Sequence, residues 1–204
     1  MTRCSGHLKF SGNMSRLILA SASPQRKTLL SSLGLRFEVI PSTVDENSHP
    51  ELDPAKRSII LAKLKALDVH GKQRAATVIG CDTLVVASDG TLLEKPKDEA
   101  EARKMLLLQS GKTSLVHSAL CVIEPSGKTH EGISTSSVTF KKLSEKEIDR
   151  WIKTTLWQGR SGGFQIDGLG QLMIASITGD WTGIVGLPVF LLGTLLEKSG
   201  LAAR

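Results

Sequence analysis

The chain has 204 residues, of which 40% are hydrophobic and 23% charged, and these globular values fit one large domain or two small lobes that share a core. No apolar run approaches the roughly 20 residues that a membrane span needs, so we expect no membrane partner. The formal net charge of +6 suits the steering of a small polyanion. Because no Lys/Arg run exceeds a pair and aromatic residues make up only 4%, we expect no stable nucleic-acid binding.

The cysteines and the first residues bear on the compartment and on the domain limits. Three cysteines, an odd number without any CxxC spacing, indicate a reducing compartment, so the expected location is the cytoplasm. Cys81 is expected to be a small buried apolar residue. Residues 1–13 are expected to form a disordered extension, and residues 14–204 a single domain.

The segment from Leu17 to Arg26 is the most informative stretch of the chain. Its apolar start predicts a buried strand, and Pro24 stands where a helix would begin. The missing N–H of proline costs nothing at that position, because the first helical amides have no intrahelical partner. The hydroxyls of Ser21 and Ser23, the helix N-terminus and Arg26 together describe an anion pocket. An ordinary strand-to-helix turn capped by serine explains the same ten residues, and on these residues alone it is the favoured interpretation.

Further along the chain, hydrophobic periodicity and turn residues predict an α/β fold with a mixed sheet. Strands are expected at 37–40, 77–87, 91–93, 115–124, 129–140 and 172–178, with 115–124 and 129–140 paired as an antiparallel ribbon. Helices are expected from 24, from 54, from 98 to about 110, from 144 to about 155, and over 189–199, and the glycine-dense segment 160–170 is expected to be a loop.

Capping residues and apolar spacing give two finer predictions for the helices. Asp53, Asp98 and Ser144 are the expected N-caps, and Glu147 completes a capping box with Ser144. In the helix that Asp53 opens, one buried stripe is expected at Ile59, Ile60, Ala62, Leu64 and Leu67.

An acid inside an apolar strand is the second strong signal. Asp82 lies between Val-Ile-Gly-Cys and Thr-Leu-Val-Val, surroundings in which a carboxylate is unfavourable unless it is paired, metal-bound or catalytic. Glu46, at the end of another strand–loop unit, is a candidate second carboxylate, since two carboxylates can hold a hard divalent cation that also bridges phosphate oxygens. A strand-end Asp bonded to backbone amides is an equally good interpretation of Asp82, and an isolated Glu46 is more often a solvated loop acid.

Lysines provide candidate cations, and several other chemistries find no support. Lys95 stands where the chain leaves a hairpin, and Lys63 and Lys65 lie two apart on a helix, so only one of them is expected to point inward. Either helical lysine is more often a surface residue. The sequence has no GxxxxGK[ST] phosphate loop and no HExxH motif, and the GxSxG match at 159–163 lacks a preceding strand and a later histidine.

Six short segments, taken together, resemble the Maf family of nucleoside triphosphate pyrophosphatases. They are SASPQR at 21–26, GCDT at 80–83, EKP at 94–96, LQSG at 108–111, the glycine-dense 162–170 and VGLP at 185–188. The resemblance implies an elongated, mixed and largely antiparallel sheet with flanking helices and two lobes around a central cleft, a fold shared with inosine triphosphate pyrophosphatases. It makes residues 14–204 a single catalytic domain that cleaves a nucleoside triphosphate to the monophosphate and pyrophosphate with Mg²⁺ or Mn²⁺. A homodimer is expected on the same basis.

The resemblance also assigns roles to residues by position. Asp82 matches the proton acceptor of the family, and Glu46 and Asp82 are the implied metal ligands. The implied substrate-binding positions in this sequence are Ser21, Ser23, Gln25, Arg26, Lys65, Thr83, Lys95 and Asp167.

Three of these positions bear on which base is bound. In the dTTP/UTP branch the positions of Gln25, Thr83 and Asp167 typically hold Arg, Thr and Gln, and in the branch resembling 7-methyl-GTP pyrophosphatases they tend to hold Trp, Gln and Glu. Thr83 fits the first branch, the acid at 167 is like the second, and Gln25 matches neither. A carboxylate only accepts hydrogen bonds and suits the donor edge of guanine, whereas glutamine both donates and accepts.

We expect dTTP, UTP or a modified nucleotide as the substrate, because Thr83 lies beside Asp82. The alternatives are a 7-methyl-GTP or inosine-triphosphate-type purine pyrophosphatase and a non-catalytic nucleotide-binding regulator. The SxSPxR and GLP segments argue against the inosine type, and the presence of Asp82, Glu46 and Lys95 favours catalysis.

Overall fold

The computed structural model describes residues 16–46 and 49–201, so the extension expected at residues 1–13 lies outside the described residues. The strands are β1 (Leu17–Leu19), β2 (Glu38–Val39), β3 (Thr77–Val86), β4 (Leu92–Leu93), β5 (Thr113–Ile123), β6 (Thr129–Phe140) and β7 (Ile174–Thr178). The α-helices are α1 (Pro24–Ser32), α2 (Pro54–Lys72), α3 (Glu99–Gln109), α4 (Glu145–Lys153), α5 (Trp181–Val185) and α6 (Val189–Lys198). Two short 3-10 helices, η2 (Ser161–Gly163) and η3 (Gly168–Met173), precede β7.

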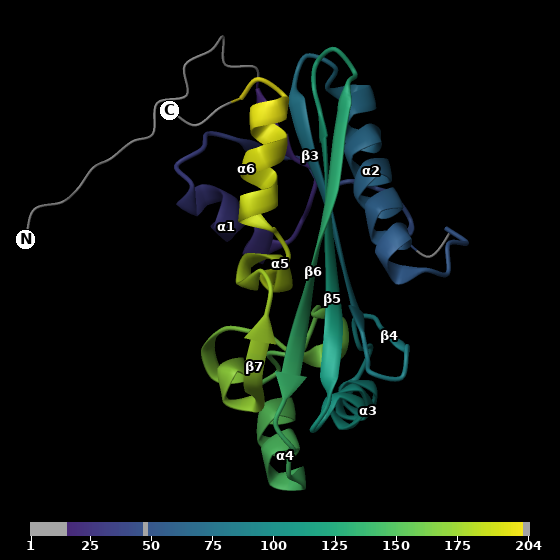
Figure 1. Ribbon diagram of the computed structural model, residues 1–204, viewed down its shortest axis with the longest axis vertical. Helices are drawn as coiled ribbons and strands as arrows, with labels where there is room; N and C mark the ends of the chain where they lie inside the picture. The colour runs from purple at the N-terminus through teal and green to yellow at the C-terminus, as the bar shows by residue number, and fades with distance from the viewer. Residues whose placement is uncertain (1–15, 47–48, 202–204) are drawn as a thin grey trace, which may run out of the picture.

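The strands form one mixed sheet in the order β2-β1-β3-β5-β6-β7, with β4 paired to β3. β1 is parallel to β2 and to β3, and every other pair is antiparallel. β3, β5 and β6 are the long strands and run along the elongated molecule (Figure 1). This confirms the predicted fold class, including the antiparallel ribbon of β5 and β6.

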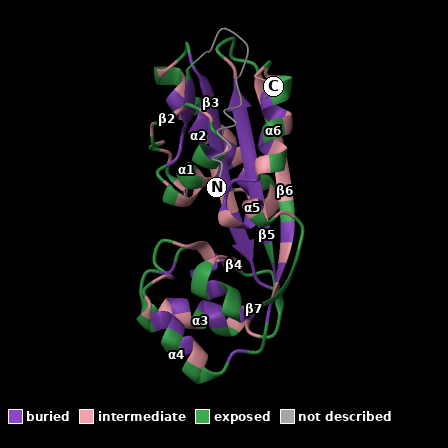
Figure 2. Cartoon of the chain, turned by 90° about the vertical axis from the view of Figure 1, so that its left-hand side faces the viewer, coloured by how far each residue is buried: buried purple, intermediate pink, exposed green. Residues whose placement is uncertain are grey.

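Helices gather at the two ends of the sheet and create two lobes, named here by their places in Figure 1. In the upper lobe, α2 covers one face of the sheet, and α1 and α6 cover the other. In the lower lobe, α3, α4, η2, η3 and β7 surround the opposite ends of β5 and β6. Buried residues follow the strands and the inward helix faces in both lobes (Figure 2).

Each lobe has its own apolar core, and the long strands contribute to both. The two faces of the upper lobe bury different side chains of β3: Val78 packs on the α2 side, and Ile79 and Cys81 pack on the α6 side. The lower-lobe core also takes Val85 from β3, together with Val116 of β5, Val138 and Phe140 of β6 and the indoles of Trp151 and Trp157. Cys81 is fully buried, as predicted.

The predicted caps are confirmed. Asp53 accepts from the amides of residues 55 and 56, Asp98 accepts from the amide of residue 101, and the Ser144–Glu147 capping box is formed. The segment 160–170 differs from the expected loop because it contains η2 and the start of η3. The last strand begins at Ile174 rather than at residue 172, and α5, which Asp180 caps, was not predicted.

The buried stripe predicted for α2 is confirmed at Ala62 and wrong at its other four positions. Ile59, Ile60 and Leu64 are only partly buried and Leu67 is 44% exposed. The side chains that α2 buries are Ser58, Leu61, Ala62, Lys65, Ala66 and Val69. Small residues lie on this face because α2 packs very close to β3: a Cβ on Gly80 would clash with the Ala62 carbonyl and lie 2.8 Å from the Ala66 Cβ. Close approach at Gly80 therefore requires small residues at positions 62 and 66 on the buried face of α2.

Within residues 16–46 and 49–201, every helix is too short or too polar to span a lipid bilayer.

Candidate functional site

A cleft of about 760 Å³ lies between the lobes and is lined by residues of both. The β1–α1 turn, the loop before α2, α2 itself and β3 line its upper side, and the segments after β4 and around η2 line its lower side. All ten site residues predicted from the sequence line this cleft: Ser21, Ser23, Gln25, Arg26, Glu46, Lys65, Asp82, Thr83, Lys95 and Asp167.

The N-terminus of α1 opens onto the cleft. Ser23 is its N-cap, with Oγ accepting from the Arg26 amide at 3.4 Å, and Pro24 begins the helix. The Ser23 amide donates to Ser21 Oγ at 3.3 Å, so both hydroxyls are drawn over the turn. Ser23, Pro24 and Gln25 line the cleft, and the positive end of the helix dipole there favours an anion.

Arg26 is the centre of a hydrogen-bond network that joins three segments. Its Nη1 donates to Ser21 Oγ (3.0 Å), its Nη2 to Thr83 Oγ1 (3.2 Å) and its Nε to the Gly186 carbonyl (2.9 Å). Thr83 Oγ1 also lies 3.0 Å from Ser118 Oγ. These neutral partners hold the guanidinium in place, and no carboxylate of the described residues lies within ion-pair distance of it. Its charge is therefore available to a bound anion.

Lys65 joins the two predicted carboxylates at the upper side of the cleft. Its Nζ donates to Asp82 Oδ1 at 2.6 Å and to Glu46 Oε1 at 2.7 Å. Lys65 and Asp82 are buried, whereas the Glu46 side chain is 45% exposed. Of the two lysines two positions apart, Lys65 points inward and Lys63 forms an ion pair with Glu131, as the helical spacing predicts.

The two carboxylates have opposite pKa shifts. Burial raises the pKa of Asp82 above its ordinary 3.8, and the charges of Lys65 and Arg26 only partly oppose this. Burial also acts to raise the pKa of Glu46, but the Lys65 hydrogen bond and the charges of Lys65, Lys95 and Arg26 outweigh it, and the net shift is downward. Paired carboxylates pushed in opposite directions are typical of sites where one of them takes up a proton.

Asp82 Oδ2 is buried and has no hydrogen-bond partner in the described part of the chain. A buried carboxylate oxygen without a partner is costly, so the cleft is incomplete without a ligand, a cation or water. Within residues 16–46 and 49–201 there is no group of three or more His, Cys, Asp and Glu residues that could hold a metal ion. Two converging carboxylates suit a hard cation only if substrate phosphates and water complete its ligands, as is common for Mg²⁺.

Two arginines of the cleft were missed by the sequence analysis. With its amide oriented to satisfy both neighbours, Gln25 donates to Ser23 Oγ (3.0 Å) and accepts from Arg160 Nη1 and Nη2 (3.1 and 3.2 Å). Arg57 Nη2 donates to the Glu46 carbonyl (3.0 Å), and its buried Nε has no partner among the described residues. Arg160 is the first residue of the glycine-dense segment 160–170, which was predicted as a loop without a role for this arginine. Arg57 lies among polar residues near the start of α2, where no pattern in the sequence indicated a role.

Lys95 and Asp167 line the cleft from separate lower-lobe segments. Lys95 follows β4 and Asp167 precedes η3. Neither side chain has an ion-pair partner in the described ranges, and the same holds for Arg160. The cleft thus combines a helix N-terminus, several unneutralised cations and one buried carboxylate, which is the chemistry of a polyanion site.

The fold and the cleft define an α/β protein of two lobes with a cation-rich cleft between them. A family model described as Maf-like protein matches residues 16–199, and this chain belongs to that family. Similar proteins include the dTTP/UTP pyrophosphatase of Deinococcus radiodurans, 43% identical over 92% of this chain and 95% of that protein. Those of Treponema denticola (42%, over 91% and 98%) and Pyrococcus furiosus (40%, over 90% and 95%) are also similar. A dITP/XTP pyrophosphatase structure from Mycobacterium abscessus overlaps 63% of this chain and 75% of its own at 14% identity, with a TM-score of 0.42.

Proposed function

We propose that this protein is a nucleoside triphosphate pyrophosphatase that hydrolyses dTTP and UTP to the monophosphate and pyrophosphate. The observation that carries the proposal is the buried Asp82, whose Oδ2 has no partner among the described residues and lies in a cleft rich in cations. Relatives at 40–43% identity over at least 90% of the chain are named dTTP/UTP pyrophosphatases, which supports the same activity here.

In this mechanism the upper side of the cleft binds the triphosphate. The amides of the α1 N-terminus, the hydroxyls of Ser21 and Ser23 and the guanidinium of Arg26 contact phosphate oxygens, and Lys65 and Lys95 add charge. Asp82 accepts a proton from water as the water oxygen bonds to phosphorus in the α–β anhydride. The bridging P–O bond breaks, and its electron pair leaves on pyrophosphate or on the nucleotide.

Glu46 and Asp82 are the residues that would hold Mg²⁺ or Mn²⁺. When bound, the cation would neutralise charge on the phosphate oxygens. Glu46, with its lowered pKa, stays ionised over the neutral range and is suited to this role. Lys65 keeps the two carboxylates together, since like charges side by side would otherwise repel.

We assign base selection to polar residues that line the cleft and are not given to the phosphates. Thr83, Gln25 with its partner Arg160, and Asp167 are the polar groups available there. We assign dTTP and UTP as preferred substrates because of the relatives. Asp167 favours a second candidate, a triphosphate whose base presents two adjacent donors, such as guanine or 7-methylguanine, since a carboxylate can accept from both.

The test is pyrophosphate release from dTTP, UTP, CTP, GTP, ITP and 7-methyl-GTP, each with Mg²⁺ and with Mn²⁺. We expect the highest kcat/KM with dTTP or UTP. A clear preference for 7-methyl-GTP, GTP or ITP would replace the pyrimidine assignment with the purine one. No release from any of them, with binding retained in a thermal-shift assay, would instead indicate a nucleotide-binding regulator.

Location and partners complete the proposal. The buried free thiols Cys81 and Cys121 pack in different core clusters, which fits the reducing cytoplasm. We propose that the protein is a homodimer and does not bind nucleic acid stably. Light scattering of the protein alone gives the mass of the oligomer, and light scattering with single-stranded DNA or RNA tests for a complex.

A further inference from the structure

The loop that carries Glu46 lies along one side of α2. This loop, residues 42–46, is named the cleft loop here; it follows β2, and Ser42, Val44, Asp45 and Glu46 line the cleft. Side chains of α2 hold it at both ends. Lys65 binds the Glu46 carboxylate and Arg57 binds the Glu46 carbonyl at the far end of the loop.

Asp68 holds the near end. Its Oδ2 accepts from the Thr43 amide (2.8 Å), from Ser42 Oγ (3.1 Å) and from Thr43 Oγ1 (3.2 Å). Three donors from two adjacent loop residues thus converge on one oxygen. Asp68 itself does not line the cleft, so any effect that it has on substrate must pass through the loop.

The three side chains of α2 that contact the cleft loop lie along one side of the helix. Arg57, Lys65 and Asp68 are spaced by eight and by three residues, which places them on the same side of an α-helix. Asp82 contacts this side of the helix through its bond to Lys65. One rigid helix, α2, therefore contacts the start of the cleft loop, the end of the loop and Asp82.

We propose that Asp68 is a positioning residue that holds the cleft loop on α2 and so keeps the Glu46 carboxylate beside Lys65 and Asp82. The expected effect on catalysis rests on the proposed function. The anchoring of the cleft loop to α2 rests on the contacts alone. Lys72 binds the other oxygen of Asp68, Oδ1, at 2.7 Å and is 60% exposed, so it can be removed without freeing the loop.

The experiment compares three variants of the whole chain. Asp68→Ala removes all three loop contacts, and Asp68→Asn keeps an oxygen that accepts them. Lys72→Ala is the matched control, because it removes the ion pair and leaves Oδ2 on the loop. Amide exchange of residues 42–46 is measured for each, together with kcat and KM for pyrophosphate release and the melting temperature.

We expect Asp68→Ala to speed amide exchange in the cleft loop at least about 10-fold and to lower kcat/KM on the order of 10- to 100-fold, the range that misplacement of a catalytic group produces. Asp68→Asn and Lys72→Ala are expected to stay within about 3-fold of the original protein in both measurements. Unchanged exchange of the Thr43 amide in Asp68→Ala would overturn the proposal whether or not the protein is active.

A double-mutant cycle separates positioning from general damage. If Asp68 acts through Glu46, Asp68→Ala made in a Glu46→Gln background lowers kcat/KM by less than about 3-fold further. An equal factor in both backgrounds would show that Asp68 only supports the fold, and would contradict the inference. If the original protein releases no pyrophosphate but Asp68→Ala speeds amide exchange in the cleft loop, the pyrophosphatase function is contradicted. The role of Asp68 in holding the cleft loop on α2 is then still supported.

Discussion

The two oxygens of Asp82 have different surroundings, and the proposed role of this residue depends on that difference. Oδ1 accepts from Lys65 at 2.6 Å, whereas Oδ2 is buried without a partner among the described residues. A carboxylate kept purely for structure would use both oxygens, because a buried polar atom left unpaired costs roughly 1–3 kcal/mol. The free oxygen is where a water molecule would be bound and deprotonated.

Asp82→Asn is the direct test of this role. The amide oxygen can still accept from Lys65, but the group can no longer take a proton, so we expect kcat to fall by about 100- to 10,000-fold. Nucleotide binding should remain, because Arg26 and the α1 N-terminus are untouched. Pyrophosphate release and nucleotide affinity are the measurements, with circular dichroism as the check of the fold. Retained turnover in the folded variant would remove Asp82 from the mechanism.

At the residue scale, ten residues that line the cleft were named in advance, but not how they are connected. Three of them, Gln25, Thr83 and Asp167, were named only through the family resemblance. Asp82 stood out because a carboxylate in an apolar strand needs a reason, and Ser23 and Arg26 because they surround a helix start. The roles of Arg57 and Asp68 could not be read in advance. Both are polar residues of a long helix, and whether they contact the cleft loop depends on which face of that helix is turned toward it.

The contact between β3 and α2 sets the position of Lys65 relative to Asp82. It depends on Gly80, because a Cβ there would lie 2.8 Å from both the Ala66 Cβ and the Ala66 nitrogen. Since the clash is with backbone and with a short side chain, neither can move aside alone. The whole helix would have to shift away from the strand.

Gly80→Ala is therefore expected to destabilise the protein by about 1–3 kcal/mol or more and to lower activity by moving Lys65 from Asp82. Gly71→Ala is the matched control in α2 itself: its Cβ would meet nothing within 4 Å, and alanine in a helix is favoured by up to about 1 kcal/mol. Urea unfolding measures both. A Gly80→Ala protein as stable as the original would show that the helix is not held as closely as described.

The capping box of α4 predicts a dependence of stability on pH. Lys141 first, and then the backbone amide and hydroxyl of Ser144, hold the pKa of Glu147 at about 2, below its ordinary 4.5. A carboxyl whose pKa is lowered by folding stabilises the protein above its unfolded pKa and loses that contribution as the pH falls through the folded pKa.

Glu147→Gln should accordingly destabilise the protein above pH 4.5, with the difference from the original shrinking as the pH falls toward about 2. Glu197→Gln serves as the control, because Glu197 is exposed on α6 and forms no ion pair within the described ranges. Chemical unfolding across the pH range is the measurement. A difference that grows on acidification would contradict the assigned sign.

At the element scale, caps and turns were predictable because they depend on a few adjacent residues. Asp53, Asp98 and the Ser144–Glu147 pair act within one turn of their helices, so their patterns need no tertiary information. The buried face of α2 was not predictable. Ile59, Ile60 and Leu64 are more apolar than Ser58 and Lys65, yet tight packing at Gly80 and the charge on Asp82 select the smaller and more polar face.

The whole molecule is joined by strands that pass through both lobes. β3 places Ile79 and Cys81 in the upper-lobe core and Val85 in the lower-lobe core, and β5 does the same with Leu120 and Val116. The sequence predicted that residues 115–124 and 129–140 pair as an antiparallel ribbon, which β5 and β6 confirm. The cleft between the lobes depends on loops that hydrophobic patterns do not specify. Neither lobe can lose its core without disrupting strands that the other needs.

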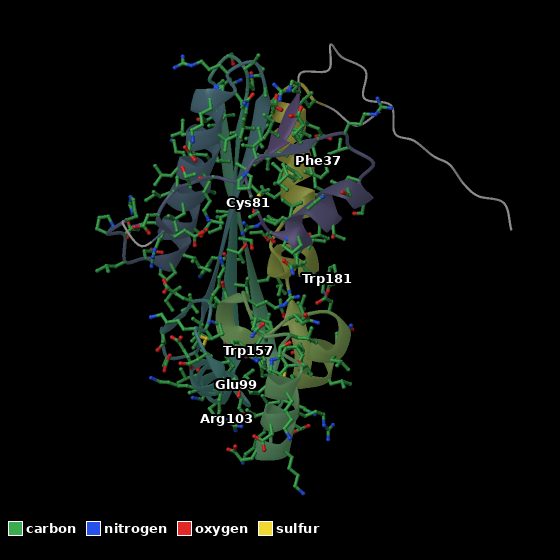
Figure 3. The ribbon with its side chains drawn as sticks, turned by 180° about the vertical axis from the view of Figure 1, so that it is seen from behind. Phe37, Cys81, Glu99, Arg103, Trp157 and Trp181 are labelled. Carbon is green, nitrogen blue, oxygen red and sulfur yellow. The ribbon has the colours of Figure 1, made fainter. Side chains whose placement is uncertain are left out.

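The two lobes are thus expected to unfold in a single transition, despite a chain length at which separate steps are common. Each lobe has its own probes. Trp151 and Trp157 are buried in the lower-lobe core, and Cys81 and Cys121 are buried in the upper-lobe cores. Trp157 and Cys81 are labelled in Figure 3. Burial raises the pKa of these two thiols to about 11 and about 12, which keeps them unreactive until the upper lobe opens.

A protein carrying Trp181→Phe and Cys4→Ser isolates those probes, because Trp181 is 43% exposed on α5 and Cys4 lies outside the described residues. Indole fluorescence then follows the lower lobe, and thiol labelling during urea unfolding follows the upper lobe. We expect the two midpoints to coincide, since β3, β5 and β6 are shared. Thiols that become reactive well before the fluorescence changes would mean that the upper lobe opens alone and that the long strands do not couple the two cores.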